Sequence, residues 1–157
     1  MRVFTRTAVV VGILALSYSA SAQTDAQVGT WKLNTAKSKY NGGTAPKSST
    51  VVVEKADGGK ALKLTANIVL ADGAPRTITY TAGCDGKDVA VTGTPDYNTV
   101  SMTCSGNTIK GVRRRGGKRA QTFSVVVSAD GKTRTSTSSG TDAMGKKVSS
   151  VQVFDKQ

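Results

Sequence analysis

Four Asp-Gly pairs divide this chain into short segments that are rich in Val, Thr, Ile and Tyr. The pairs are Asp57-Gly58, Asp72-Gly73, Asp85-Gly86 and Asp130-Gly131. Asp-Gly favours the tight primed turns of β-hairpins, because these turns need positive φ angles that Gly and Asp tolerate best. Strands joined by such turns are antiparallel neighbours. The spacing therefore predicts an all-β, up-and-down meander that closes into a barrel of eight to ten strands.

Ten segments between the turns are strand candidates. They are Gln27–Asn34, Ser48–Lys55, Lys60–Leu70, Arg76–Ala82, Lys87–Thr92, Tyr97–Cys104, Thr108–Arg115, Arg119–Ser128, Thr133–Gly140 and Lys146–Asp155. Alternation is clearest in the third, where Leu62, Leu64 and Ala66 share one face and Lys63 and Thr65 share the other. A period of two with one polar face is typical of an antiparallel sheet that meets water on one side.

Two segments leave the interpretation open. The longest connection, Thr35–Lys47, has room for one short helical turn around Ala36–Lys39, which Pro46 would end. The ninth strand candidate, Thr133–Gly140, is almost entirely Ser and Thr and has no apolar face. It forms either an exposed edge or part of a wet interior.

The beginning of the chain has the pattern of a signal peptide. Arg2 and Arg6 precede an apolar run, Ala8–Leu16, that is too short to span a bilayer. Ala20-Ser21-Ala22 then supplies the small residues of a signal-peptidase site. We therefore expect residues 1–22 to be removed and residues 23–157 to form a barrel domain that is periplasmic or secreted. The alternative is a short membrane anchor, and no later stretch reaches the roughly 18 apolar residues of a membrane helix.

Cys84 and Cys104 are the two cysteines of the chain. Pairing the strand before the Gly93–Asp96 turn with the strand after it places Cys104 opposite Gly86, close to Cys84. Export to an oxidising compartment then favours a disulfide between the two. Two independent thiols are the alternative, and a metal site is disfavoured because the chain contains no His.

The segment Gly29-Thr30-Trp31-Lys32-Leu33 resembles the opening strand of the lipocalins and fatty-acid-binding proteins. In that superfamily the Trp of the G-x-W motif closes the narrow end of the barrel, which implies a closing role for Gly29 and Trp31. The segment Val151–Lys156 is similar to the last strand of the fatty-acid-binding proteins. The resemblance implies a lipocalin-like barrel that binds a small hydrophobic ligand, and Trp31 is read as a core plug rather than a ligand contact. The resemblance also extends to small exported bacterial proteins of lipocalin-like type with no assigned function.

The resemblance departs from the family at the ligand-binding positions. Fatty-acid-binding proteins hold the ligand carboxylate with an Arg-x-Tyr pair on the last strand, and the matching positions here are Gln152 and Phe154. The avidins, which open with the same Gly-Thr-Trp, hold biotin in a box of several Trp side chains, whereas Trp31 is the single Trp of this chain. The resemblance therefore carries the fold and leaves the ligand open.

Arg113, Arg114 and Arg115, with Lys118 and Arg119, form the densest charge cluster of the sequence. A turn at Gly116-Gly117 would bring these side chains to one hairpin tip, and alternation directs at least one Arg inward. The cluster is either an anion clamp built from guanidinium groups or a solvated hairpin that protects a sheet edge. The candidate ligand-binding residues are Arg113, Arg115, Arg119, Tyr80, Phe123, Gln152 and Phe154.

The composition argues against catalysis. Without His, the chain lacks the commonest general base, and Glu54 is its one Glu. Its many Ser residues have no base to activate them. We expect no enzyme activity, no cofactor and no metal site.

Two functions remain open. The chain is either a binding protein for a small apolar or amphipathic, anionic ligand, or an interaction module that docks on an anionic surface, polymer or protein. The formal net charge of +12 suits both functions. Nucleic acid is not expected as a partner, because few aromatic residues accompany the basic ones.

Overall fold

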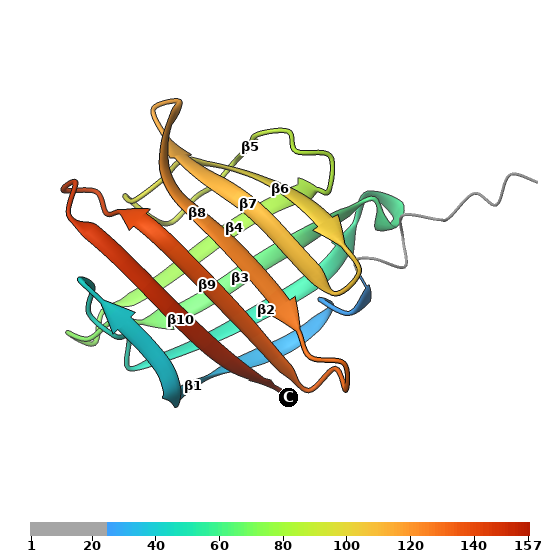
Figure 1. The fold of residues 1–157 in the computed structure, drawn as a ribbon, viewed down its shortest axis with the longest axis horizontal. Helices are drawn as coiled ribbons and strands as arrows, with labels where there is room; N and C mark the ends of the chain where they lie inside the picture. Colours follow the sequence, from blue (N-terminus) through green and yellow to red (C-terminus); the bar gives the residue numbers. More distant parts are fainter. Residues whose placement is uncertain (1–24) are drawn as a thin grey trace, which may run out of the picture.

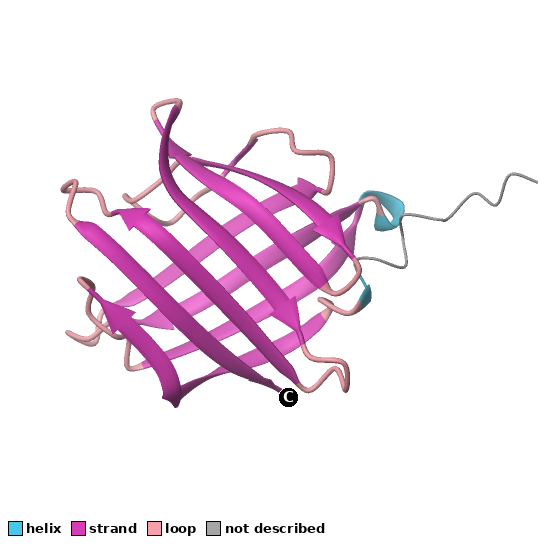
Figure 2. Cartoon of the chain, in the orientation of Figure 1, coloured by secondary structure: helices cyan, strands magenta, loops and turns pink. Residues whose placement is uncertain are grey.

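Ten antiparallel strands form one sheet that curls into a nearly closed barrel (Figure 1). The computed structural model describes residues 25–157, so the expected signal peptide lies outside the described residues. The strands are β1 (Gly29–Asn41), β2 (Ser48–Ala56), β3 (Ala61–Val69), β4 (Pro75–Gly83), β5 (Val89–Ala90), β6 (Thr99–Ser105), β7 (Thr108–Arg115), β8 (Lys118–Val127), β9 (Thr133–Thr141) and β10 (Lys147–Lys156). Figure 2 shows how little helix accompanies them. No helix in residues 25–157 has the length and apolar character needed to cross a membrane. The all-β meander predicted from the sequence is confirmed.

Strands that are consecutive in the chain pair in the sheet, except β4 and β5, which form its two edges. We call the line between these two edges the seam. The order is β4-β3-β2-β1-β10-β9-β8-β7-β6-β5, so the pairing of β1 with β10 joins the two halves of the meander. The barrel is left to close between β4 and the short β5. There, an isolated bridge between Thr79 and Thr92 connects the two edges, with both backbone N–H groups donating to the opposite carbonyls at 3.1–3.2 Å. The seam is therefore the least hydrogen-bonded line of the barrel wall in the described residues.

Three of the four Asp-Gly pairs lie in hairpin turns, as the sequence predicted. They connect β2 to β3, β3 to β4 and β8 to β9. The fourth, Asp85-Gly86, lies in the connection that crosses the seam, and its Gly86 N–H donates to the Met102 carbonyl of β6 at 3.0 Å.

β1 is longer than the sequence predicted. It continues to Asn41, where a helical turn was expected around Ala36–Lys39, and its register with β10 shifts between Asn34 and Lys39. The Asn34 side chain accepts the Lys37 N–H at 3.1 Å, and the Ser38 hydroxyl donates to the Asn34 carbonyl at 2.7 Å. These local bonds absorb the extra residues as a bulge, so the strand bends and resumes pairing.

One end of the barrel is filled by a packed core. Trp31 is fully buried there, and its Nε1 donates to the Gln27 carbonyl at 2.9 Å. The ammonium group of Lys156 lies 5.1 Å from the centre of the Trp31 ring. A side chain at Gly29 would meet Lys156, because a Cβ at that position would lie 2.9 Å from its Cε. We call this the closed end, and Gly29 and Trp31 lie where the lipocalin resemblance places them.

The disulfide crosses the seam at the closed end. Cys84 follows β4 and Cys104 belongs to β6, and the Cα atoms of the pair are 5.3 Å apart. The bridge between Asp85 and Thr103 lies next to it. One covalent bond therefore connects two edge regions that the backbone joins through isolated bridges rather than a continuous ladder.

Gly93 allows the close approach of the two edges beside the Thr79–Thr92 bridge. Its φ is 87°, and a Cβ there would lie 1.7 Å from the carbonyl oxygen of Thr77. We expect Gly93→Ala to lower the free energy of unfolding by about 2–3 kcal/mol, because backbone strain and overpacking act together. Urea unfolding followed by circular dichroism measures the change.

Gly116→Ala is the matched control for Gly93→Ala. Gly116 also has a positive φ, 56°, but a Cβ there would meet nothing within 4 Å. We expect this variant to lose about 1 kcal/mol or less, from the backbone conformation alone. Equal losses in the two variants would show that the contact with Thr77 carries no energy.

Candidate ligand-binding site

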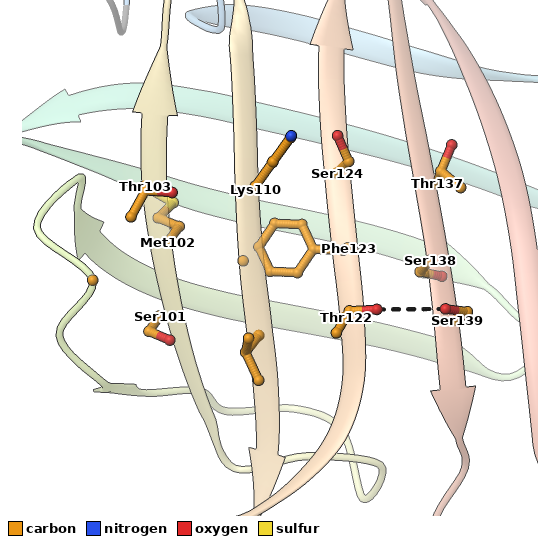
Figure 3. Close-up of a pocket in the computed structure, with 13 residues that line it drawn as sticks. Ser101, Met102, Thr103, Lys110, Thr122, Phe123, Ser124, Thr137, Ser138 and Ser139 are labelled. Carbon is orange, nitrogen blue, oxygen red and sulfur yellow. Dashed lines mark hydrogen bonds between the residues drawn. The ribbon is translucent and has the colours of Figure 1, made fainter.

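The barrel wall has a broad groove on its outside, over β6 to β9. The groove has a volume of about 550 Å³ and is open to solvent. Figure 3 shows hydroxyl side chains along it, with Thr122 and Ser139 joined by a hydrogen bond of 3.4 Å. Lys110 is its one charged lining residue. The groove thus offers few groups that could fix an anionic ligand.

Gly111 shapes the wall behind this groove. A Cβ at Gly111 would lie 2.4 Å from the ring of Phe123, which extends from β8 towards β7 (Figure 3). The Phe123 ring thus fills the place that a side chain of β7 would take, and it contributes to the barrel interior as the sequence predicted.

A second cavity lies inside the barrel, at the end opposite Trp31. Its volume is about 410 Å³. Its mouth is lined by residues of the β1–β2, β5–β6 and β9–β10 loops, including Thr44, Asp96 and Asp142. Its apolar wall includes Leu64, Ile68, Ile78, Tyr80, Phe123 and Phe154. The barrel is therefore packed at the closed end and hollow towards the mouth.

Arg134 of β9 lies at the base of this cavity. Its side chain is 5 % exposed, and it also borders the packed core together with Tyr80 and Phe123. Its guanidinium lies 5.7 Å from the centre of the Phe154 ring. Its Nε has no hydrogen-bond partner, and no carboxylate of residues 25–157 lies within 4.0 Å of the group. Burial lowers the pKa of Arg134 to about 10, so the group still carries its charge at neutral pH.

Arg113 of β7 also lines the cavity, as does the half-buried Arg76 of β4. Arg113 lies between two aromatic rings, 4.9 Å from the centre of Tyr97 and 4.7 Å from the centre of Phe123. Its Nη1 donates to Gln121 Oε1 at 3.0 Å, and its Nε has no partner. Among residues 25–157 it too has no carboxylate within 4.0 Å. Stacking between rings fixes the guanidinium and leaves donors available to a ligand.

The other basic residues of the Arg113 hairpin lie elsewhere. Arg115 donates from Nη1 to the carbonyls of Asp96 and Asp142, at 2.8 and 2.7 Å, and so ties two mouth loops together. Arg114 forms an ion pair with Asp88 on the outside. Arg119 is exposed and does not line the cavity. The hairpin thus contributes one arginine, Arg113, to the interior.

Gln152 and Phe154 of β10, two of the candidate ligand-binding residues, both line the cavity. Gln152 donates from Nε2 to the Tyr40 hydroxyl at 3.1 Å. Burial raises the pKa of the Tyr40 phenol, and the Gln152 hydrogen bond opposes that shift. Burial also raises the pKa of Tyr80, against the charges of Arg113 and Arg134. Both phenols are therefore neutral donors at physiological pH.

These groups can hold an anion. The buried Arg134, the half-buried Arg113, neutral phenols and hydroxyls supply hydrogen-bond donors. Within residues 25–157, no three His, Cys, Asp or Glu side chains gather as a metal site would require.

Arg134 is the one central residue that the sequence analysis missed. The alternation in Thr133–Gly140 puts Arg134, Ser136 and Ser138 on one face but does not say which way that face points. The structure shows that it points inward, so this strand lines a wet interior. The sequence does contain a signal for this direction. Pairing the residues on the two sides of the Asp130-Gly131 turn sets Arg134 opposite Val127, which faces inward.

Comparisons with known proteins support the fold and no specific function. No family model matches the chain, and no curated protein matches it by sequence. Among solved structures, a protein of unknown function from the DUF3598 family of Nostoc punctiforme matches with a TM-score of 0.53 and 18 % identity. The match covers 86 % of this chain and 49 % of that one, so the chain spans about half of that protein.

A zebrafish ileal bile acid-binding protein in complex with cholic acid also matches, with a TM-score of 0.49 and 13 % identity. That match covers 84 % of this chain and 99 % of the other. At such identities the likeness extends to the fold alone. The ten-stranded, nearly closed antiparallel meander confirms that the chain has the lipocalin-like, or calycin-like, barrel fold that its sequence resembles.

Proposed function

We propose that this chain is an exported, non-enzymatic binding protein that holds a small amphipathic anion inside its barrel. One observation carries the proposal. Arg134 is a buried cation that borders a cavity and has no carboxylate partner in the described residues. A buried, unpaired charge costs several kcal/mol, and an anionic ligand offsets that cost when it binds.

The cavity suits the rest of such a ligand. Its apolar wall can cover a hydrophobic body, while Arg113 and Arg134 hold the charged group. This assignment keeps Arg113, Tyr80, Phe123, Gln152 and Phe154 from the candidate residues of the sequence. It replaces Arg115 and Arg119 with Arg134. The signal peptide and the seam disulfide support export, because disulfides persist in oxidising compartments.

A pair of fluorescent probes tests the proposal. Anilinonaphthalene sulfonate is anionic, and N-phenylnaphthylamine has the same ring system without the sulfonate. We expect the parent protein to bind both in the cavity. Arg134→Gln should weaken sulfonate binding by more than about tenfold, or 1.4 kcal/mol, because a charge-assisted hydrogen bond is lost. Binding of the neutral probe should change little.

Arg119→Gln is the matched control, because it removes the same charge from an exposed hairpin position. It should bind both probes as the parent does. If Arg134→Gln retains full affinity for the sulfonate, the proposed site is wrong. If Arg119→Gln loses as much affinity as Arg134→Gln, the basic exterior binds the anion, as the interaction-module hypothesis requires.

A further inference from the structure

The inner surface of the cavity carries more positive than negative charge. Its charged lining residues are Arg76, Asp96, Arg113, Arg134 and Asp142. The side chains of both aspartates accept backbone hydrogen bonds from a mouth loop. Asp96 Oδ1 accepts the Ala143 N–H at 2.9 Å, and Asp142 Oδ1 accepts the N–H groups of Met144 and Lys146 at 3.0 and 2.9 Å. These bonds hold both carboxylates at the mouth, and neither lies within 4.0 Å of the guanidinium of Arg76, Arg113 or Arg134.

Arg113 and Arg134 act as one electrostatic unit. They come from β7 and β9, yet the charge of Arg113 contributes to the lowered pKa of Arg134. Both charges also act on the Tyr80 phenol, which lies on β4. Two like charges that repel each other inside a low-dielectric barrel make each other more costly.

A ligand with one negative charge would neutralise only half of this unit. We infer, on the basis of the proposed function, that the ligand carries a compact dianionic head group, such as a phosphate monoester, on an apolar body. A dianion balances both guanidiniums and can accept charge-assisted hydrogen bonds from each of them. Ser136, Ser138 and Gln152 add neutral donors to the same lining.

Decyl phosphate and decyl sulfate test the head-group charge. They share a tail and a tetrahedral head, but the phosphate loses its second proton near pH 6 while the sulfate keeps a single charge. Titration calorimetry below the micelle concentration should show that decyl phosphate binds more than about tenfold tighter than decyl sulfate near pH 8. The ratio should fall to about threefold or less near pH 5, where both heads carry one charge.

The sulfate measured at both pH values corrects for titration of the protein. The groups that face the cavity are the carboxyls of Asp96 and Asp142 and the phenols of Tyr40, Tyr80 and Tyr97. The change in sulfate affinity between the two pH values reports their effect on a ligand of constant charge.

Arg113→Gln and Arg134→Gln should each abolish the preference for phosphate at pH 8, because each removes one of the two guanidiniums proposed to bind the head group. Arg119→Gln should preserve it. If phosphate and sulfate bind the parent protein equally well at both pH values, the dianion inference is overturned while the proposed binding function stands. If decyl phosphate, decyl sulfate and the fluorescent sulfonate all fail to bind, both the dianion inference and the proposed binding function are wrong.

Discussion

Arg134→Met is expected to make the ligand-free protein more stable while removing its affinity for anions. Methionine replaces the aliphatic stem of the side chain but removes the guanidinium beside Phe154 and its buried charge. Burial lowers the pKa of Arg134 to about 10, so the unfolded chain binds this proton more tightly than the folded protein does. Below that pH the charge costs stability in full, and the cost begins to fall only as the pH rises through about 10 and ends above the pKa of the unfolded chain.

We expect a gain of about 1–3 kcal/mol in the free energy of unfolding at neutral pH. The same variant should lose the preference for the anionic probe over its neutral analogue. Urea unfolding of delipidated protein measures the stability, with Arg119→Met as the control for the same substitution at an exposed position. A loss of stability in Arg134→Met beyond that of the control would show that the guanidinium holds the fold together rather than a ligand.

Replacement of both Cys84 and Cys104 by Ser is expected to lower the free energy of unfolding by about 2–4 kcal/mol. The crosslink closes a loop of 20 positions and so restricts the unfolded chain. It also spans the seam, where the backbone contributes two isolated bridges rather than a ladder. Hydrogen exchange at the amides of Thr79 and Thr92 should therefore accelerate more in the variant than exchange within the ladder of β2 and β3.

A reducing agent supplies the control for the cysteine variant. Dithiothreitol should lower the melting temperature of the parent protein towards that of the double variant and leave the variant itself unchanged. An unchanged melting temperature in the parent, with both thiols shown to be free by mass, would contradict a stabilising role for the bond.

The fold was accessible from the sequence because its signals are local. Asp-Gly turns and alternation in segments such as Ala61–Val69 depend on neighbouring residues, so they predict strands and hairpins directly. The bend of β1 was missed because a bulge near Asn34 depends on β10, which lies 121 positions away in the chain. The short β5 was predicted longer for the same reason, since its segment crosses to β4 at Thr92.

The sequence predicted the site only in part, because whether a side chain points into the barrel depends on how the barrel closes. The sequence pointed to Arg113 through charge density, and that density also drew attention to Arg119, which lies outside. Arg134 stands alone among hydroxyl residues, so no local pattern marks it. Only the register across the β8–β9 turn reveals that it faces inward.

The pairing of β1 with β10 also determines when the barrel can be completed. Asn34 and Asp155, which hydrogen-bond across this pair, are separated by 121 positions, so their meeting carries a high entropic cost of loop closure. Such distant contacts raise the contact order and slow folding. Until β10 docks, β1 and β9 present unpaired edges that can recruit other chains.

The disulfide has no such delay, because its two cysteines are 20 positions apart. It can join β4 to β6 before the strands that lie farther apart in the chain have paired. Oxidation early in folding therefore turns the assembly of a ten-stranded barrel into the docking of two arms that are already joined at their centre.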